Sequence, residues 1–418
     1  MLKHNLTILL LLVFIANAAN ANHKLLSDTT LKIGHKTIKT TKRTKVGTPV
    51  IPMWEAGTPN QNLRDGAGFP ILTGAQHAAV WGPETKEEGA YNHYACLIFY
   101  KGKFLAMWGN HPLGEDAPGQ RVLFSVSNEW GKWAKPTEIF AAPGPVKPKS
   151  DEGIHLKPDR WIIIEDILYA VTYVHGAGRY PIARSVSENG ILGEPFLVRD
   201  LPKNAKLPIY MQQANALQPI GDKITNWYVQ NDQVSWWADK NEGVNRKGVD
   251  GSQLIETFSY RAKDDGLVLM LRNWGTPSNP VHNNRMYVSF KKGKEGWGTP
   301  YPTDIPDSPT RGQALRLTDG TILLIGSQNA PIFDEALYLD RDPITISISK
   351  DGYTFDRVYA LRTASPKKFR FSGVKGRNPG YAYSSSIIHE GWLYTLYSIG
   401  KEDMAISKVA LEKLLGDK

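Results

Sequence analysis

The sequence has 418 residues, with 50 Lys and Arg against 41 Asp and Glu, and a single Cys. A chain of this length can bury a large core, and one thiol excludes a fold held together by disulfides. Gly 38, Pro 27 and an aromatic content of 10% are typical of a turn-rich all-β protein and argue against a helical bundle or a disordered chain.

The N-terminal segment has the pattern of a secretory signal. Basic residues precede the apolar run 8–15, and Ala21 ends a small-residue cleavage site. We therefore expect residues 1–21 to be a signal peptide and residues 22–418 to form a single catalytic domain of a secreted protein. No later segment offers the roughly 18 apolar residues of a membrane span, so no membrane association is expected.

The formal net charge of +9 fits an acidic partner, although solubility alone also explains it. An early basic cluster between Lys36 and Lys45 alternates with Thr and Ile and lacks interleaved aromatics. This pattern favours a solvated strand face over a nucleic-acid site. We expect a monomer that binds an anionic polymer other than nucleic acid.

The strongest pattern along the chain is a recurring hairpin, in which two apolar strands flank a tight turn built on Gly or an acidic residue. Successive turns lie about 44 to 71 residues apart, a spacing that suits four-stranded propeller blades with variable loops. The six turns are Lys101-Gly102, Glu165-Asp166, Gly221-Asp222, Asp265-Gly266, Asp319-Gly320 and Glu390-Gly391.

Two degenerate Asp-box-like turns, 127–133 and 349–355, follow third strands. In such turns the acidic side chain bonds nearby backbone and the aromatic residue packs between blades, so their role is structural. Residues 405–409 are predicted to form the last strand, and the segment 30–55 could supply a strand that closes the ring. These features favour a sialidase-like propeller of six or seven blades.

In a propeller, the loops between second and third strands gather on one face, together with the starts of the first strands. The turn at Lys101-Gly102 places residue 93 opposite residue 110 or 111, so His93 and His111 are expected to be neighbours there. Two imidazoles at a rim can carry protons, bind a metal or contact an acidic ligand. A pair of ordinary, hydrogen-bonded rim histidines is the alternative.

The next hairpin repeats this layout. Aligning the two hairpins puts His175 where His111 stands, with Tyr173 near the same rim and Arg184 facing back toward it from the third strand. Tyr169 and Tyr173 share a strand face, so one can be functional while the other is packed. The further candidates for substrate binding are Asn110, Tyr228 and Arg272.

A rim with His, Tyr and Arg but no evident pair of carboxylates is poorly suited to the usual glycosidase mechanism. It suits β-elimination on a uronic acid. Arg or His neutralises the carboxylate so that the C5 proton becomes acidic, and Tyr or His takes that proton and protonates the departing O4.

At these residues the sequence resembles the secreted seven-bladed polysaccharide lyases, namely the ulvan lyases and their rhamnose-glucuronate lyase relatives. The resemblance rests on three motifs: 91–93, 108–111 with 115–121, and 183–186 with Gly190. The stretches 303–311 and 397–403 are similar to the wider sialidase-like group.

The resemblance implies an all-β fold, a seven-bladed β-propeller of four-stranded antiparallel blades. It also implies cleavage of ulvan, a sulfated polymer of rhamnose and uronic acid, by elimination at the uronate. His93 and His111 match the paired histidines of the family, Arg184 its arginine, and Tyr173 or Tyr169 its catalytic tyrosine. The chemistry needs no cofactor; some members carry a structural zinc or calcium, whose ligands cannot be placed here.

Two other classes of function remain open. A sialidase-like exo-glycosidase would use a tyrosine nucleophile, an acidic partner and three arginines, for which Arg184, Arg272 and Arg311 are available. Against this, no Arg-Ile-Pro motif occurs near the N-terminus, where Gly68-Phe69-Pro70-Ile71 stands instead. A non-catalytic glycan-binding propeller is the third interpretation.

Overall fold

A computed structural model gives the fold of the chain. It describes residues 28–33, 36–44, 47–60, 66–148, 153–176, 178–211, 219–234, 244–274, 284–291, 296–331 and 338–416. The predicted signal peptide lies outside the described residues. Within them, no helix is both long and apolar enough to cross a membrane.

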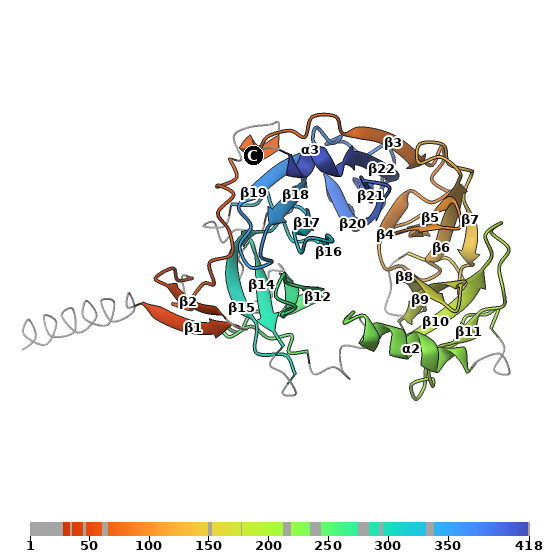
Figure 1. The fold of residues 1–418 in the computed structure, drawn as a ribbon. Helices are drawn as coiled ribbons and strands as arrows, with labels where there is room; N and C mark the ends of the chain where they lie inside the picture. Colours follow the sequence, from red (N-terminus) through yellow and green to blue (C-terminus); the bar gives the residue numbers. More distant parts are fainter. Residues whose placement is uncertain are drawn as a thin grey trace, which may run out of the picture.

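The described strands form five four-stranded antiparallel sheets, arranged as blades in a ring around a central axis (Figure 1). The first two blades contain β4 (Tyr91–Tyr100), β5 (Lys103–His111), β6 (Arg121–Ser127) and β7 (Thr137–Phe140), then β8 (His155–Ile164), β9 (Ile167–His175), β10 (Tyr180–Val186) and β11 (Phe196–Leu197). The next two contain β12 (Leu254–Arg261), β13 (Leu267–Asn273), β14 (Arg285–Phe290) and β15 (Tyr301–Pro306), then β16 (Gln313–Arg316), β17 (Ile322–Gly326), β18 (Ile344–Ser349) and β19 (Arg357–Arg362).

The fifth blade closes the ring. It combines β20 (Tyr381–His389), β21 (Trp392–Ile399) and β22 (Asp403–Ala410) with β3 (Gln76–Trp81) from the N-terminal part of the chain. The closing strand therefore comes from later in the sequence than the expected segment 30–55. That segment instead contains a separate hairpin, β1 (Thr29–Ile33) and β2 (Lys36–Thr40), which projects from the ring beside β15 (Figure 1).

The prediction of seven blades was wrong: one of the six predicted turns does not join two strands, and no turn had been identified for a seventh blade. Five of the six predicted turns join the first and second strands of the five blades. The sixth, Gly221-Asp222, lies inside the helix α2 (Ile220–Gln230), which lies between β11 and β12 in the ring (Figure 1). Ile224 and Tyr228 of this helix are buried at the spacing of one helical face. The remaining helical elements are η1 (Gly66–Gly68) and α3 (Leu411–Leu415).

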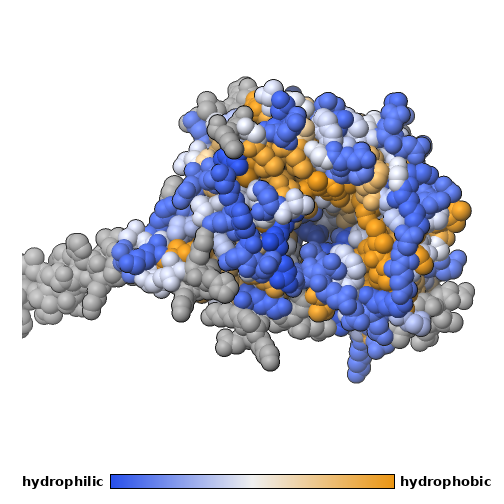
Figure 2. Space-filling model, in the orientation of Figure 1, coloured by the Kyte–Doolittle hydropathy of each residue, from blue (hydrophilic) through white to orange (hydrophobic). Residues whose placement is uncertain are grey.

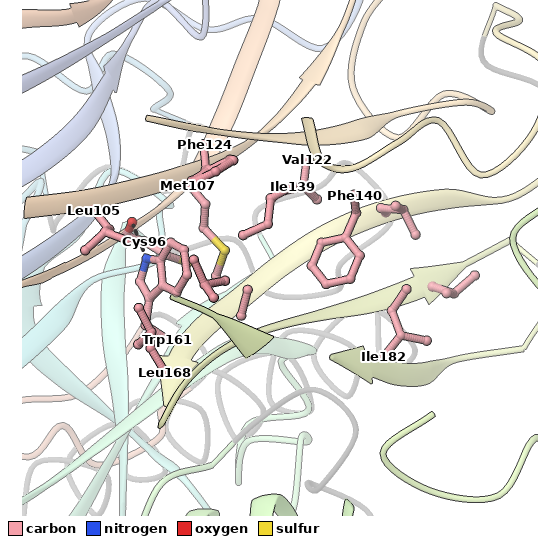
Figure 3. Close-up of a cluster of buried hydrophobic side chains, with 14 of the residues drawn as sticks. Cys96, Leu105, Met107, Val122, Phe124, Ile139, Phe140, Trp161, Leu168 and Ile182 are labelled. Atoms are coloured by element: carbon pink, nitrogen blue, oxygen red, sulfur yellow. Dashed lines mark hydrogen bonds between the residues drawn. The ribbon is translucent and has the colours of Figure 1, made fainter. Parts of the chain in front are cut away.

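The core lies between the blades rather than inside one central cluster. Between the first two blades, Met107, Phe124 and Phe140 pack against Trp161 and Leu168 (Figure 3). The Asp-box-like turn 349–355 behaves as expected: Asp351 Oδ1 accepts hydrogen bonds from the backbone of Tyr353 and Thr354, and Phe355 is buried between neighbouring blades. This inter-blade packing holds the innermost strands rigidly around the axis.

Candidate active site

The site lies in a cavity of about 660 Å³ on the axis, on the face where innermost strands start and second strands end. The space-filling view shows the ring hollowed at its centre (Figure 2). The cavity lies on the face predicted from the propeller topology. Its lining includes Tyr94, Glu115, Asp116, His155, Lys157, His175, Arg179, Arg246, Glu256, Arg272, Trp274 and Tyr383.

Three innermost strands carry the same local irregularity. Tyr94 in β4, Glu256 in β12 and Tyr383 in β20 have positive φ angles of 62°, 53° and 55°, each at a shift in strand register. Positive φ is uncommon for residues other than glycine, and a bulge re-aims the side chain beside it. All three bulged residues line the cavity, so the irregularities bring their polar groups together.

Tyr383, Glu256 and Arg272 form one hydrogen-bonded group. The Tyr383 hydroxyl donates to Glu256 Oε1, and Arg272 Nη1 donates to Glu256 Oε2 at 2.5 Å and to the Tyr383 hydroxyl at 2.9 Å. The phenol therefore lies between a carboxylate that can accept its proton and a guanidinium that stabilises the resulting negative charge.

The surroundings fix the charges of this group. Burial raises the pKa of Glu256, but Arg272 and the Tyr383 hydroxyl outweigh burial and hold that pKa below its ordinary value. Burial and the charge of Glu256 raise the pKa of Tyr383 well above its ordinary value. The resting site thus has an ionised Glu256 beside a protonated phenol.

A second arginine approaches from the neighbouring blade. Arg341 is only 2% exposed, and its guanidinium carbon lies 5.9 Å from the centre of the Tyr383 ring. Nη2 donates to the carbonyl of Pro309 at 2.5 Å, whereas Nε and Nη1 have no hydrogen-bond partner among the described residues. Both atoms are buried and Arg341 is not among the residues that line the cavity, so it contributes positive charge beside the Tyr383 ring.

A polar network centred on Tyr94 forms another wall. The Tyr94 hydroxyl donates to Asp116 Oδ1 at 2.9 Å and lies 3.2 Å from Glu115 Oε1. Lys157 pairs with Asp116 at 2.7 Å, and the buried Lys401 pairs with Glu115 at 2.8 Å. Although burial raises the pKa of Asp116, Lys157 and its other partners hold that pKa well below the usual range.

A histidine pair stands next to this wall. The rings of His155 and His175 stack with centroids 5.2 Å apart, and His155 Nε2 lies 3.8 Å from Asp116 Oδ1. Burial, followed by the charge of Lys157, lowers the pKa of His175 to about 2. His175 is therefore neutral at ordinary pH. At the cavity mouth, Trp274 is 44% exposed, which leaves its ring accessible to a ligand.

The four predicted catalytic residues do not converge. His93 is fully buried beside the site, with its ring 4.0 Å from that of Tyr383. His111 pairs across the hairpin with Tyr91 rather than with His93, which faces Gly109. His111 Nδ1 accepts from the backbone of residues 113 and 114, and Nε2 lies 3.1 Å from the Pro118 carbonyl.

Tyr173 and Arg184 lie outside the cavity lining. Tyr173 is buried, with its ring 5.0 Å from that of His175. Arg184 donates to the backbone carbonyls of Gly193 at 2.7 Å and Ile139 at 2.8 Å, so it connects strands away from the axis. The catalytic roles assigned to the four residues stay predictions.

Of the predicted substrate-binding residues, His175 and Arg272 line the cavity. Asn110 is buried in the first blade, where it donates to Asn92 at 2.8 Å. Tyr169 packs on Phe196, and Tyr228 donates to Asp159 from α2. These three residues do not line the cavity.

Glu256, Tyr383 and Arg341 were missed by the sequence reasoning. One available signal was position: Glu256 and Tyr383 stand near the starts of first strands, the places that topology brings to the axis. The expected structural zinc or calcium remains untested. Within the described residues, no group of three or more His, Cys, Asp or Glu is arranged to hold a metal ion.

The fold and the site define a sialidase-like β-propeller. Residues 101–395 match the BNR repeat-like domain family, and the chain belongs to this family. No curated protein gives a match.

The chain is similar to several solved structures. A sialidase superposes with a TM-score of 0.64 and 17% sequence identity, covering 86% of this chain and 35% of its own. A Trypanosoma rangeli sialidase mutant with trans-sialidase activity gives 0.46 and 10%, covering 84% and 61%. An N-acetylgalactosamine deacetylase from F. plautii gives 0.43 and 9%, covering 81% and 95%. The present chain thus spans about a third of the first of these proteins.

Proposed function

We propose that the chain is a secreted retaining glycoside hydrolase that acts on a sugar bearing a carboxylate, with Tyr383 as its nucleophile. The observation that supports this most is the Tyr383 hydroxyl held between Glu256 and Arg272. A tyrosine nucleophile is an established exception to the paired-carboxylate rule among glycosidases. A carboxylate-bearing substrate repels a carboxylate nucleophile but not a neutral phenol.

In this mechanism Glu256 accepts the proton of Tyr383 while the phenolic oxygen attacks the anomeric carbon. The bond from that carbon to the leaving oxygen breaks, and the Tyr94 hydroxyl, oriented by the ionised Asp116, supplies the proton for the leaving oxygen. A water molecule then attacks the anomeric carbon and gives one proton to Tyr94, and Tyr383 departs and recovers its proton from Glu256. Arg272 stabilises the phenolic oxygen throughout.

The substrate carboxylate is assigned to the arginine side of the cavity, where Arg272 lines the wall. A guanidinium binds a carboxylate in a directional manner. Arg341 lies next to the ring of the nucleophile, outside the lining, and adds positive charge there. The reacting carbon and the carboxylate of a sugar acid lie close enough for both to be engaged together.

β-Elimination on a uronate polymer is the second candidate, and it would make the chain a lyase of the ulvan or rhamnose-glucuronate type. The specific observation in its favour is a basic wall containing Lys157, Arg179 and Arg246 beside the His155–His175 pair. Such a wall suits a sulfated polyanion. Tyr383 would then pass the C5 proton to Glu256 instead of attacking a carbon.

Product analysis distinguishes these proposals. The full chain is incubated with aryl sialosides, aryl glucuronides, ulvan and an unsulfated rhamnose-glucuronate polymer. Hydrolysis gives new reducing ends, and a fluorinated substrate analogue should leave a covalent adduct that peptide mass spectrometry locates on Tyr383. Unsaturated uronyl ends, detected by ultraviolet absorbance, would replace the hydrolase proposal by the lyase. Binding without either product would leave a glycan-binding protein.

A further inference from the structure

A second pocket opens toward the other end of the ring axis. It has a volume of about 340 Å³ and is lined by the five innermost strands together with α2 and the segment before β16. Tyr94 and Tyr383 line both this pocket and the catalytic cavity, so these two aromatic side chains separate the two spaces. The volume falls within the range of small-molecule sites.

An incompletely bonded carboxylate lies in the wall of this pocket. Asp159 is 3% exposed; its Oδ2 accepts a hydrogen bond from Tyr228 on α2 and lies 3.5 Å from Arg160 Nε. Its Oδ1 has no hydrogen-bond partner among the described residues. The Asp159 side chain has no exposed area, so the carboxylate acts on the pocket through its charge and not through direct contact with a ligand.

An arginine whose guanidinium has unused hydrogen-bond donors lines the same pocket. Arg311 makes no hydrogen bond and no ion pair with the described part of the chain, although the charge of Asp159 acts on it and helps to raise its pKa against the effect of burial. Its donors call for an acceptor. Because the charge of Asp159 balances that of Arg311, the guanidinium suits the hydroxyl oxygens of a neutral ligand, which accept hydrogen bonds.

An aromatic side chain completes the pocket. Trp227 of α2 lines it, and the guanidinium of Arg160 lies 5.8 Å from the indole ring while Arg160 Nη1 donates to Gln233 at 2.8 Å. The indole is thereby held in one orientation. An apolar ring face beside a guanidinium matches the two sides of a sugar, which presents C–H groups on its faces and hydroxyls at its edge.

We propose that this second pocket binds a neutral pyranose residue of a carbohydrate, with Trp227 against the sugar face and Arg311 on its hydroxyls. Tyr94 and Tyr383 separate this site from the catalytic cavity. Binding in the second pocket does not require turnover. It would hold a carbohydrate chain to the ring while another segment reacts. This assignment is independent of the reaction proposed for Tyr383.

The test is saturation-transfer NMR on the full chain with a panel of methyl glycosides of glucose, galactose, mannose, rhamnose and xylose. At least one of them should bind the wild type. Binding should weaken about tenfold or more in Trp227→Ala and in Arg311→Gln, and it should persist in the matched aromatic control Trp274→Ala, which changes the catalytic cavity only.

Arg311→Gln guards against a misfolded Trp227 variant, since Arg311 makes no hydrogen bond within the described part of the chain. Saturation transfer from none of the five glycosides would overturn the proposal. So would affinity unchanged in a folded Arg311→Gln variant, or lost in Trp274→Ala alone. None of these outcomes depends on turnover, and inactivity toward every substrate tested would leave the binding result intact.

Discussion

Tyr383→Phe removes the single oxygen on which the proposed chemistry depends and leaves the ring in place. The variant loses the nucleophile, and Glu256 loses the proton that it would accept. We therefore expect kcat/KM to fall by about 10³-fold or more. The substrate carboxylate still meets Arg272, so KM should change much less than kcat. The loss of a residue with only a packing role would not lower kcat while leaving KM nearly unchanged.

The structure also predicts how much Tyr383→Phe lowers the free energy of unfolding. The hydroxyl makes two hydrogen bonds to charged groups, one to Glu256 and one with Arg272, and such bonds contribute about 1.5–3 kcal/mol each. Glu256 and Arg272 keep their own contact at 2.5 Å, so no buried charge is left alone. We therefore expect the free energy of unfolding to fall by about 3–6 kcal/mol, measured by urea titration.

Tyr173→Phe is the matched control. Tyr173 is as buried as Tyr383 and was the tyrosine predicted from the sequence, yet it lies outside the cavity lining. Its variant should keep kcat/KM within about threefold of wild type, measured on the same aryl glycoside. The reasoning is refuted if Tyr173→Phe is the inactive variant, or if Tyr383→Phe keeps more than about a tenth of wild-type activity.

The remaining predictions concern stability, an inter-strand arginine and salt. Burial raises the pKa of Asp307 from 3.8 to about 7, so the folded chain holds a proton that the unfolded chain releases, and stability should fall as the pH rises between these values. About three pKa units correspond to at most about 4 kcal/mol, and urea titrations should show that Asp307→Asn removes this fall. Arg184→Met loses bonds to two backbone carbonyls and should reduce stability by about 1–3 kcal/mol without changing kcat. Added salt should raise KM for an anionic substrate more than it lowers kcat; equal KM at low and high salt would contradict a charged binding wall.

The blade architecture was predictable because turn chemistry is local. Five turns of the predicted kind sit between first and second strands, where a residue with positive φ is required. Gly221-Asp222 has the same composition but lies in a helix. There the apolar residues Ile220, Ile224 and Tyr228 follow a spacing of four, so burial of one helical face outweighs the turn signal.

Register was harder to predict because of a bulge. A two-residue turn at Lys101-Gly102 implies that residue 93 faces residue 110, but the irregularity after His93 shifts the pairing to Gly109. One inserted residue is enough to move every later pair on the strand. No composition rule marks Tyr94 as a residue with positive φ, so the error could not have been avoided from the hairpin alone.

The same bulges explain why the candidate site was missed while its location was found. Topology alone brings the starts of innermost strands to the axis, and this placed the site on the correct face. The identity of the side chains that meet there depends on the local backbone conformation at Glu256 and Tyr383. These two residues are 127 positions apart and share a hydrogen bond. Backbone strain at non-glycine residues persists where the surrounding structure enforces it, and it is concentrated at functional sites. Packing between the blades holds the backbone at Tyr383 in its positive-φ conformation. The rigid ring and this local strain are therefore parts of one arrangement.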